Sequence, residues 1–213
     1  ATGGILFLDE FPEFSRAALE TLRQPLEERE VTVSRVEASV TYPANFQLVA
    51  AMNPCPCGHF PDRSRCRCTE GQITRYLQKV SGPMLDRIDI CVEASPITYG
   101  DIKSSGNNES SREIRARVEQ ARKIQGERFA GENIRCNGEM SGRHIRKFCW
   151  LGREEEKFME EIFKKLALSA RMHDRILKVA RTTADLAEEE KIRLADLCEA
   201  VSYVKSRDKF WGN

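Results

Sequence analysis

The order of apolar patterns along the chain constrains its fold more than any other feature. Up to about residue 93, short apolar runs typical of strands alternate with stretches of helical period, whereas beyond residue 111 every strong segment has helical period. Strands that alternate with helices build α/β sheets, and helical segments alone build bundles. We therefore predict an α/β domain over residues 1–97, followed by an all-α domain over residues 98–213 that begins near a polar linker at 104–111.

The α/β domain is predicted to hold three core strands, at residues 5–8, 46–52 and 88–93. The first reads Ile-Leu-Phe-Leu, a pattern typical of a strand buried on both faces. Residues 31–33 and 40–42 surround a short polar segment, which predicts a β-hairpin. Between the first strand and the hairpin we predict a helix. Ser15 is a good N-cap for it, and Pro25 must kink or end it.

The composition excludes several classes of protein. The 213 residues carry 34 Lys and Arg against 33 Asp and Glu, and a net charge of +1 excludes a polycation that holds nucleic acid by bulk charge. Mean hydropathy is −0.51, and the sequence has neither a long apolar stretch nor a secretory signal. We therefore predict a cytoplasmic protein with no membrane partner.

Polar residues that suit phosphate chemistry lie beside the predicted strands. Asp9 and Glu10 come directly after the first strand, and Asn53 follows the second. Ligands of open α/β sheets bind at the carboxyl ends of strands, where one carboxylate can hold Mg²⁺ and another can activate a water. Arg87, just before the third predicted strand, can stabilise charge on a transferred phosphoryl group.

These residues also have plain structural interpretations. An acidic residue after a buried strand often caps the following turn. Arg87 can pair with Asp86 or Asp89 at the surface. The residues by themselves leave both alternatives open.

Four of the eight cysteines crowd into one short loop. They are Cys55, Cys57, Cys66 and Cys68. Phe60 is the one large apolar residue between the two pairs, so the loop cannot form a core, and four thiolates on such a loop are typical of a structural Zn²⁺ site. His59 can replace one sulfur. The alternatives are reduced surface thiols, or a redox pair or disulfides, which the cytoplasm disfavours.

Five segments carry a resemblance to one family, and they begin at residues 3, 22, 48, 82 and 168: GGILFLDEFPEF, LRQPLEEREVTVSR, LVAAMNPCPCG, GPMLDRIDI and LSARMHDRILKVARTTADL. They resemble the magnesium-chelatase-like AAA+ ATPases, most closely the bacterial ComM/YifB subgroup. The resemblance spans almost the whole chain and is weakest over residues 104–148. It implies the carboxy-terminal part of the nucleotide-binding α/β domain, followed by a helical lid domain.

The resemblance also implies roles for single residues around ATP and Mg²⁺. Asp9 and Glu10 match the Walker B acids, and Asn53 matches sensor 1. Arg87 matches the arginine finger that acts on a neighbouring subunit, and Arg171 matches the sensor 2 arginine. Because such ATPases work as rings, we expect the complete protein to self-associate, as a hexamer.

The predicted hairpin matches the pre-sensor 1 hairpin of this clade, which projects into the central channel of hexameric helicases. Arg35 at its tip is the residue that we expect to contact a DNA backbone, because six copies around a ring would form a basic band. The alternative is a solvated turn in which Arg35 pairs with Glu37.

One motif of the family is missing. No G-x-x-x-x-G-K-[ST] phosphate loop occurs in the chain, so we expect a carboxy-terminal fragment of a longer protein that is inactive alone. The resemblance implies that the complete protein couples ATP hydrolysis to DNA remodelling such as branch migration. The alternatives are a chelatase motor subunit that drives Mg²⁺ insertion into a porphyrin, and a non-catalytic, zinc-bearing interaction module.

Overall fold

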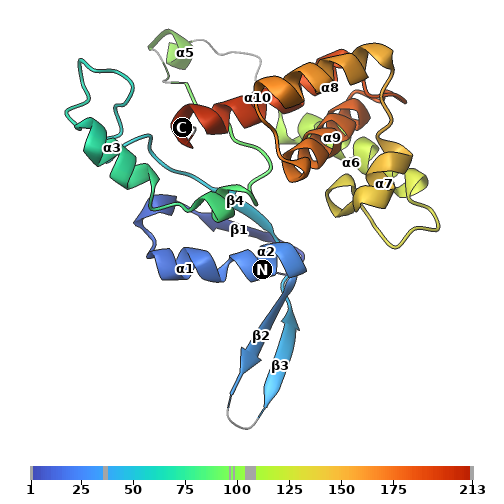
Figure 1. The fold of residues 1–213 in the computed structure, drawn as a ribbon, viewed down its shortest axis with the longest axis horizontal. Helices are drawn as coiled ribbons and strands as arrows, with labels where there is room; N and C mark the ends of the chain where they lie inside the picture. Colours follow the sequence, from blue (N-terminus) through green and yellow to red (C-terminus); the bar gives the residue numbers. More distant parts are fainter. Residues whose placement is uncertain (1, 36–37, 96, 98, 104–108, 212–213) are drawn as a thin grey trace. The chain divides into compact units, whose positions relative to one another are not determined.

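The computed structural model describes residues 2–35, 38–95, 97, 99–103 and 109–211. The chain divides into two compact units, Ala1–Asp89 with Arg207–Asn213, and Ile90–Ser206 (Figure 1). Most of the predicted linker, residues 104–108, lies outside the described residues. The first unit contains strands and helices, and the second is helical, which confirms the predicted class of α/β followed by all-α.

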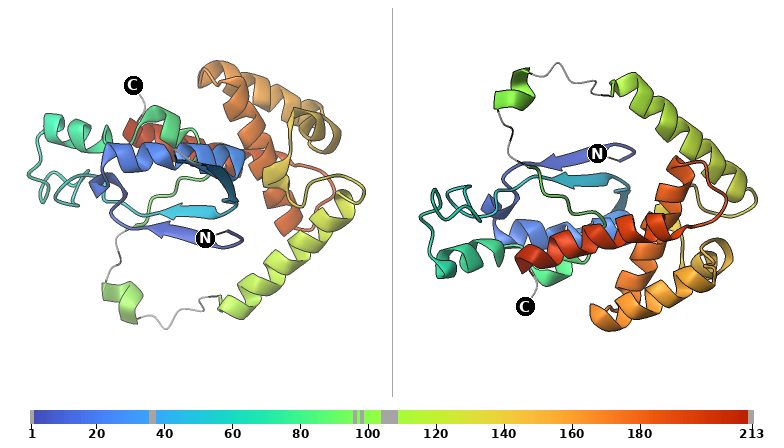
Figure 2. Two further views of the ribbon diagram at one scale, coloured as in Figure 1. Left: turned by 90° about the horizontal axis from the view of Figure 1, so that it is seen from below. Right: turned by 90° about the horizontal axis from the view of Figure 1, so that it is seen from above.

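A two-stranded parallel ribbon forms the centre of the first unit. It pairs β1 (Ile5–Leu8) with β4 (Gln47–Ala50), and Leu8 stands opposite Ala50 at the carboxyl ends. Two short helices, α1 (Arg16–Thr21) and α2 (Arg23–Glu28), lie along one face of the ribbon (Figure 2). Their leucines pack with the strand leucines into one core, which holds Leu8, Leu19, Leu22, Leu26 and Leu48.

The local signals for these helices are confirmed. The Ser15 hydroxyl accepts a hydrogen bond from the Ala18 N–H at 3.2 Å and so caps α1. Pro25 lies in the first turn of α2, and the helix is interrupted at Leu22. The break follows from the missing N–H of proline.

Two predictions about the strands are wrong. The other face of β1 is open, with Ile5 64% and Phe7 58% exposed, because α1 and α2 cover one side of the ribbon and side chains alternate along a strand. The segment at 88–93 is not a strand, and Val92 is 74% exposed. A strand needs a hydrogen-bonded neighbour, and within the described ranges β1 and β4 pair with each other alone.

The predicted hairpin is confirmed. Strands β2 (Glu30–Ser34) and β3 (Ser39–Pro43) pair antiparallel and extend away from the ribbon (Figure 1). Val33 stands opposite Val40 on one face, and Thr32 opposite Thr41 on the other. Both faces are largely exposed, so the hairpin is available for contacts.

The remaining elements of the first unit are short. They are the 3₁₀ turn η1 (Phe11–Glu13) and the helices α3 (Glu70–Leu77) and α4 (Gly82–Leu85). Thr69 and Gln72 form a capping box at the start of α3. The Trp211 indole N–H, at the end of the chain, donates to the Leu77 carbonyl at 3.1 Å.

The second unit is built from helices. In chain order they are α5 (Tyr99–Lys103), α6 (Ser111–Arg128), η2 (Asn137–Glu139), α7 (Gly142–Phe148), α8 (Arg153–Lys165), α9 (Ala170–Leu186) and α10 (Leu194–Trp211), whose last turn belongs to the first unit. Asp185 is fully buried at the centre, where its carboxylate binds Arg128 and Arg181. None of the described helices is long and apolar enough to cross a bilayer.

Candidate functional site

Asp9 and Asn53 lie beyond the carboxyl ends of two paired parallel strands. The ladder continues past these ends, because Ala51 N–H donates to the Leu8 carbonyl at 2.9 Å and Phe11 N–H donates to the Ala51 carbonyl at 3.0 Å. Both side chains are exposed. The strand-end site, defined as Asp9, Glu10 and Asn53, therefore has the placement that the sequence predicts for a ligand site in an α/β sheet.

A strained turn presents Glu10. Its backbone adopts the left-handed conformation, with φ 49° and ψ 44°, which costs a non-glycine residue on the order of 1 kcal/mol. The turn is held on both sides, since the Asp9 carboxylate accepts from the Glu10 N–H at 2.9 Å and the next residue, Phe11, is 2% exposed in the core. Such strain persists where surrounding contacts enforce it, and it often marks functional sites.

Tyr76 of α3 supports the site from the core, and no pattern in the sequence pointed to it. Its side chain is 6% exposed, and the Asn53 backbone lies close enough to the phenol to lower its pKa against the effect of burial. Burial raises the pKa of Tyr76, and the negative charges of Glu13 and Glu10 raise it further. Tyr76 therefore stays a neutral phenol, buried on α3 beside the backbone of Asn53.

Arg87 follows α4 and is held within its own unit. Its guanidinium donates to the Glu27 carboxylate and to the Pro83 carbonyl, and its side chain is 10% exposed. Glu27 lies 60 residues away in the chain, so no local pattern in the sequence pointed to this pair. The Arg87 Nε is buried without a hydrogen-bond partner among the described residues.

The other two predicted arginines are exposed. Arg171 lies in the first turn of α9 in the helical unit, where the Ser169 hydroxyl caps the helix by accepting from the Met172 N–H at 3.2 Å. Arg35 ends the hairpin, and its N–H donates to the Ala38 carbonyl at 2.8 Å. Glu37, its suggested partner, lies outside the described residues.

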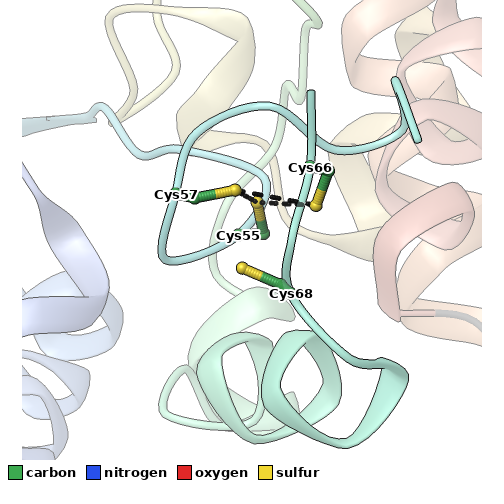
Figure 3. Close-up of side chains that lie close together, drawn as sticks. All are labelled: Cys55, Cys57, Cys66 and Cys68. Atoms are coloured by element: carbon green, nitrogen blue, oxygen red, sulfur yellow. Dashed lines mark hydrogen bonds between the residues drawn. The ribbon is translucent and has the colours of Figure 1, made fainter. Parts of the chain in front are cut away.

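The four loop cysteines converge (Figure 3). Their sulfurs all lie within 4.8 Å of one another, and the separations from Cys55 to Cys57, Cys57 to Cys66 and Cys55 to Cys66 are 3.4, 3.6 and 3.8 Å. A disulfide would place two sulfurs about 2.05 Å apart, whereas a tetrahedral Zn²⁺ with Zn–S bonds of about 2.3 Å separates its sulfurs by about 3.8 Å. The spacing therefore fits a four-thiolate metal centre.

The surroundings of the four sulfurs differ. Cys55 is fully buried and accepts a hydrogen bond from the Phe60 N–H at 3.4 Å, while Cys57 is exposed. The backbone at His59 is the main cause that lowers the pKa of Cys57 to about 6, and burial raises the pKa of Cys68 to about 12. Thiolate ligands that accept backbone N–H groups are typical of metal centres. His59 is not part of the cluster among the described residues.

The side chains of the cysteine cluster and of the strand-end site suit different metals. Soft sulfur ligands in a tetrahedron select Zn²⁺ or iron, whereas the carboxylates of Asp9 and Glu10 offer the hard oxygens that suit Mg²⁺. Arg63 lies beside the cluster, where it donates to the Cys68 carbonyl at 3.2 Å and pairs with the Glu70 carboxylate.

Comparisons with known proteins agree with this architecture. The family model described as magnesium chelatase, subunit ChlI, matches residues 1–102, and the model for the ChlI C-terminal region matches residues 108–204. The chain is 45% identical to competence protein ComM of Haemophilus influenzae and 44% identical to the uncharacterized protein YifB of Escherichia coli, each over 95% of the chain. An uncharacterized protein of Mycobacterium tuberculosis is 38% identical over 94% of the chain.

The chain spans 39% of the length of each of these relatives. The two family matches cover both units, and the relatives match almost all of the chain. The chain therefore belongs to the magnesium-chelatase-like family of AAA+ ATPases, in the subgroup that contains ComM and YifB.

Proposed function

We propose that this chain supplies the hydrolytic residues of an ATP site in a ring-forming motor, and that the complete protein uses ATP hydrolysis to remodel DNA, including branch migration. The observation that carries the proposal is the strand-end site, where two acids and an amide follow paired parallel strands in a chain of this family. Residues 1–97 would provide these groups, and residues 98–213 would form the helical lid.

Each residue of the strand-end site has a distinct role in the proposal. Asp9 holds Mg²⁺, which neutralises phosphate charge when it is bound. Glu10 accepts the proton of the attacking water, since its strained turn aims a carboxylate outward. Asn53 orients that water with its amide, and Arg171 senses the nucleotide from the lid.

Arg87 acts in the proposal on ATP bound by a neighbouring subunit of the ring. Its contact with the Glu27 carboxylate shows that its guanidinium already binds an oxyanion in the isolated chain. A phosphate is also an oxyanion, and its oxygens accept hydrogen bonds from a guanidinium in the same way. We propose that Arg87 exchanges Glu27 for a phosphate when subunits assemble, as a hexamer.

The hairpin and the cysteine cluster complete the proposal. Arg35 stands at the tip of two exposed strands, so it can reach a phosphate backbone in a central channel. The four cysteines hold a structural Zn²⁺, which the sulfur separations support. The complete protein would work in the cytoplasm.

A chelatase motor is the second candidate, because the matching family model bears that name. ATPase assays of the complete protein distinguish the two functions. We expect DNA to stimulate hydrolysis in the unmodified protein, and Arg35→Ala to remove most of that stimulation while basal hydrolysis persists. Lys103→Ala, a basic residue of α5, serves as the control. Stimulation by a porphyrin, with indifference to DNA, would overturn the DNA proposal.

A further inference from the structure

We infer that the Zn²⁺ of the four-cysteine cluster is a positioning device, which fixes the loop and the helix that hold Asn53 at the strand-end site. The inference rests on the proposed role of Asn53. Its evidence, however, comes from contacts within the first unit that do not depend on ATP. One contact involves the segment of Cys55 and Cys57, and the other involves the segment of Cys66 and Cys68.

The first pair lies on the loop that leaves Asn53. Cys55 follows two residues later and is fully buried, and the Gly58 N–H donates to the Cys55 carbonyl at 3.0 Å. This turn brings Gly58 back against Asn53, so that a Cβ at position 58 would lie 3.7 Å from the Asn53 Oδ1. Gly58 has φ +77°, a conformation that favours glycine. Metal–sulfur bonds at Cys55 and Cys57 would therefore hold the turn that places Gly58 against the Asn53 side chain.

The second pair lies on the segment that begins α3. Cys68 directly precedes Thr69, the N-cap of that helix. Two turns later, Tyr76 of the same helix is buried beside the Asn53 backbone, which lowers the pKa of its phenol. The position of α3, and hence of the phenol, depends on where the cluster holds Cys66 and Cys68.

The apolar core around the cluster is too small to fix this arrangement by itself. Besides the two buried cysteines it contains Ile73, Tyr76 and Leu77, with a few half-buried neighbours. Small cores of this kind commonly need a metal or a cross-link. In the cluster the four sulfurs face one another from two separate segments, so a single ion bonds both segments at once (Figure 3).

The first measurement is the metal content of the reduced 213-residue chain purified from zinc-replete cells. We expect about one zinc per chain, and cobalt substitution should give the visible bands of a tetrahedral thiolate site. Cys57→Ser, which removes an exposed ligand with little loss of packing, should weaken zinc binding about tenfold or more. Cys198→Ser, at an exposed cysteine of α10, is the matched control and should retain the metal.

The second measurement reports on Asn53 itself. We expect chelation of the zinc to shift the side-chain amide signal of Asn53 in ¹⁵N NMR spectra, assigned by its loss in Asn53→Ala, and to leave the signal of Asn45 in place. Zinc should restore the Asn53 signal, and Cys57→His, which keeps a ligand, should restore it in part. Gly58→Ala should shift the same signal with zinc still bound, because it places a methyl group in van der Waals contact with the amide, 3.7 Å from its Oδ1.

Three results would overturn the inference: no bound zinc, iron in its place, or an Asn53 signal that chelation leaves unchanged. Gly58→Ala keeps all four ligands, so it tests the contact even if Cys57→Ser unfolds the loop. Failure of the proposed function would look different. An Asn53→Ala variant of the complete protein that hydrolyses ATP normally would remove the role of Asn53, while the metal and NMR results would stand.

Discussion

The guanidinium of Arg87 is bound to the carboxylate of Glu27 at the end of α2, and the pair joins two segments that are 60 residues apart. The proposal that Arg87 acts on the nucleotide of a neighbouring subunit requires this pair to open. In that proposal, a phosphate of the neighbouring subunit's nucleotide takes the place of the Glu27 carboxylate.

The Arg87–Glu27 pair gives the first prediction. In the complete protein, Arg87→Ala should lower kcat by a factor on the order of 10³, the range found for arginine fingers. Glu27→Gln should leave kcat within about a few fold, since it removes the competing anion and keeps the arginine. Steady-state ATP hydrolysis measures both. Equal losses in the two variants would show that the pair is needed as such, and that Arg87 does not act on phosphate.

The hydroxyl of Tyr76 gives the second. Tyr76→Phe should destabilise the 213-residue chain by about 1 kcal/mol, because it removes the buried hydroxyl that the Asn53 backbone approaches. Urea unfolding followed by circular dichroism measures the loss. Tyr99→Phe, at a tyrosine that is 72% exposed, is the control and should change little. A Tyr76 variant as stable as the control would mean that the hydroxyl contributes nothing.

These examples show which features the sequence could predict. Ser15 and Pro25 act on their own turns, so local patterns placed the cap and the helix break. The hairpin was predictable because alternation and its turn lie within a few residues. The strand expected at 88–93 was not, since a strand depends on a partner that no local pattern shows.

The site was predictable to a similar extent. Strand-end placement of Asp9 and Asn53 follows from the sequence, because it needs no knowledge of distant contacts. The contacts of Arg87 with Glu27 and of Tyr76 with Asn53 do not follow from the sequence, because each joins segments that are far apart in the chain. The cysteine spacing indicated a metal, and the structure adds the sulfur separations that distinguish a tetrahedral centre from disulfides.

The third prediction concerns the buried charges of the helical unit. Asp185 is fully buried and binds Arg128, Arg181 and the Asn137 amide. Asp185→Ala should destabilise this unit by about 3–5 kcal/mol, because it leaves buried guanidinium groups without a counter-charge. Chemical unfolding measures the effect, with Glu161→Ala on the exposed surface of α8 as the control. A loss below about 1 kcal/mol would contradict this account of the core.

Cys149 gives the fourth prediction, which depends on pH. Burial raises the pKa of this thiol to about 12, above the ordinary value of 9.0, so the thiol stays protonated in the folded chain. Its contribution to stability is present below pH 9 and is lost as pH rises from 9 towards 12, because the unfolded thiol ionises first.

Alkylation with iodoacetamide tests the state of Cys149. At pH 8 the folded chain should be modified at the exposed Cys198 and not at Cys149, as read by peptide mass spectrometry. Urea should remove the difference. Equal labelling of the two cysteines in the folded chain would show that Cys149 is not buried in solution.

The strand-end site is tested most directly by Glu10→Gln in the complete protein, compared with Glu28→Gln at the end of α2. Single-turnover hydrolysis and ATP binding are measured on the same preparations. We expect Glu10→Gln to bind ATP as the unmodified protein does and to hydrolyse it at least about 100-fold more slowly, because the general base is gone, while Glu28→Gln hydrolyses normally. Hydrolysis by Glu10→Gln at the rate of the control would contradict the assignment of these strand ends as the hydrolytic site.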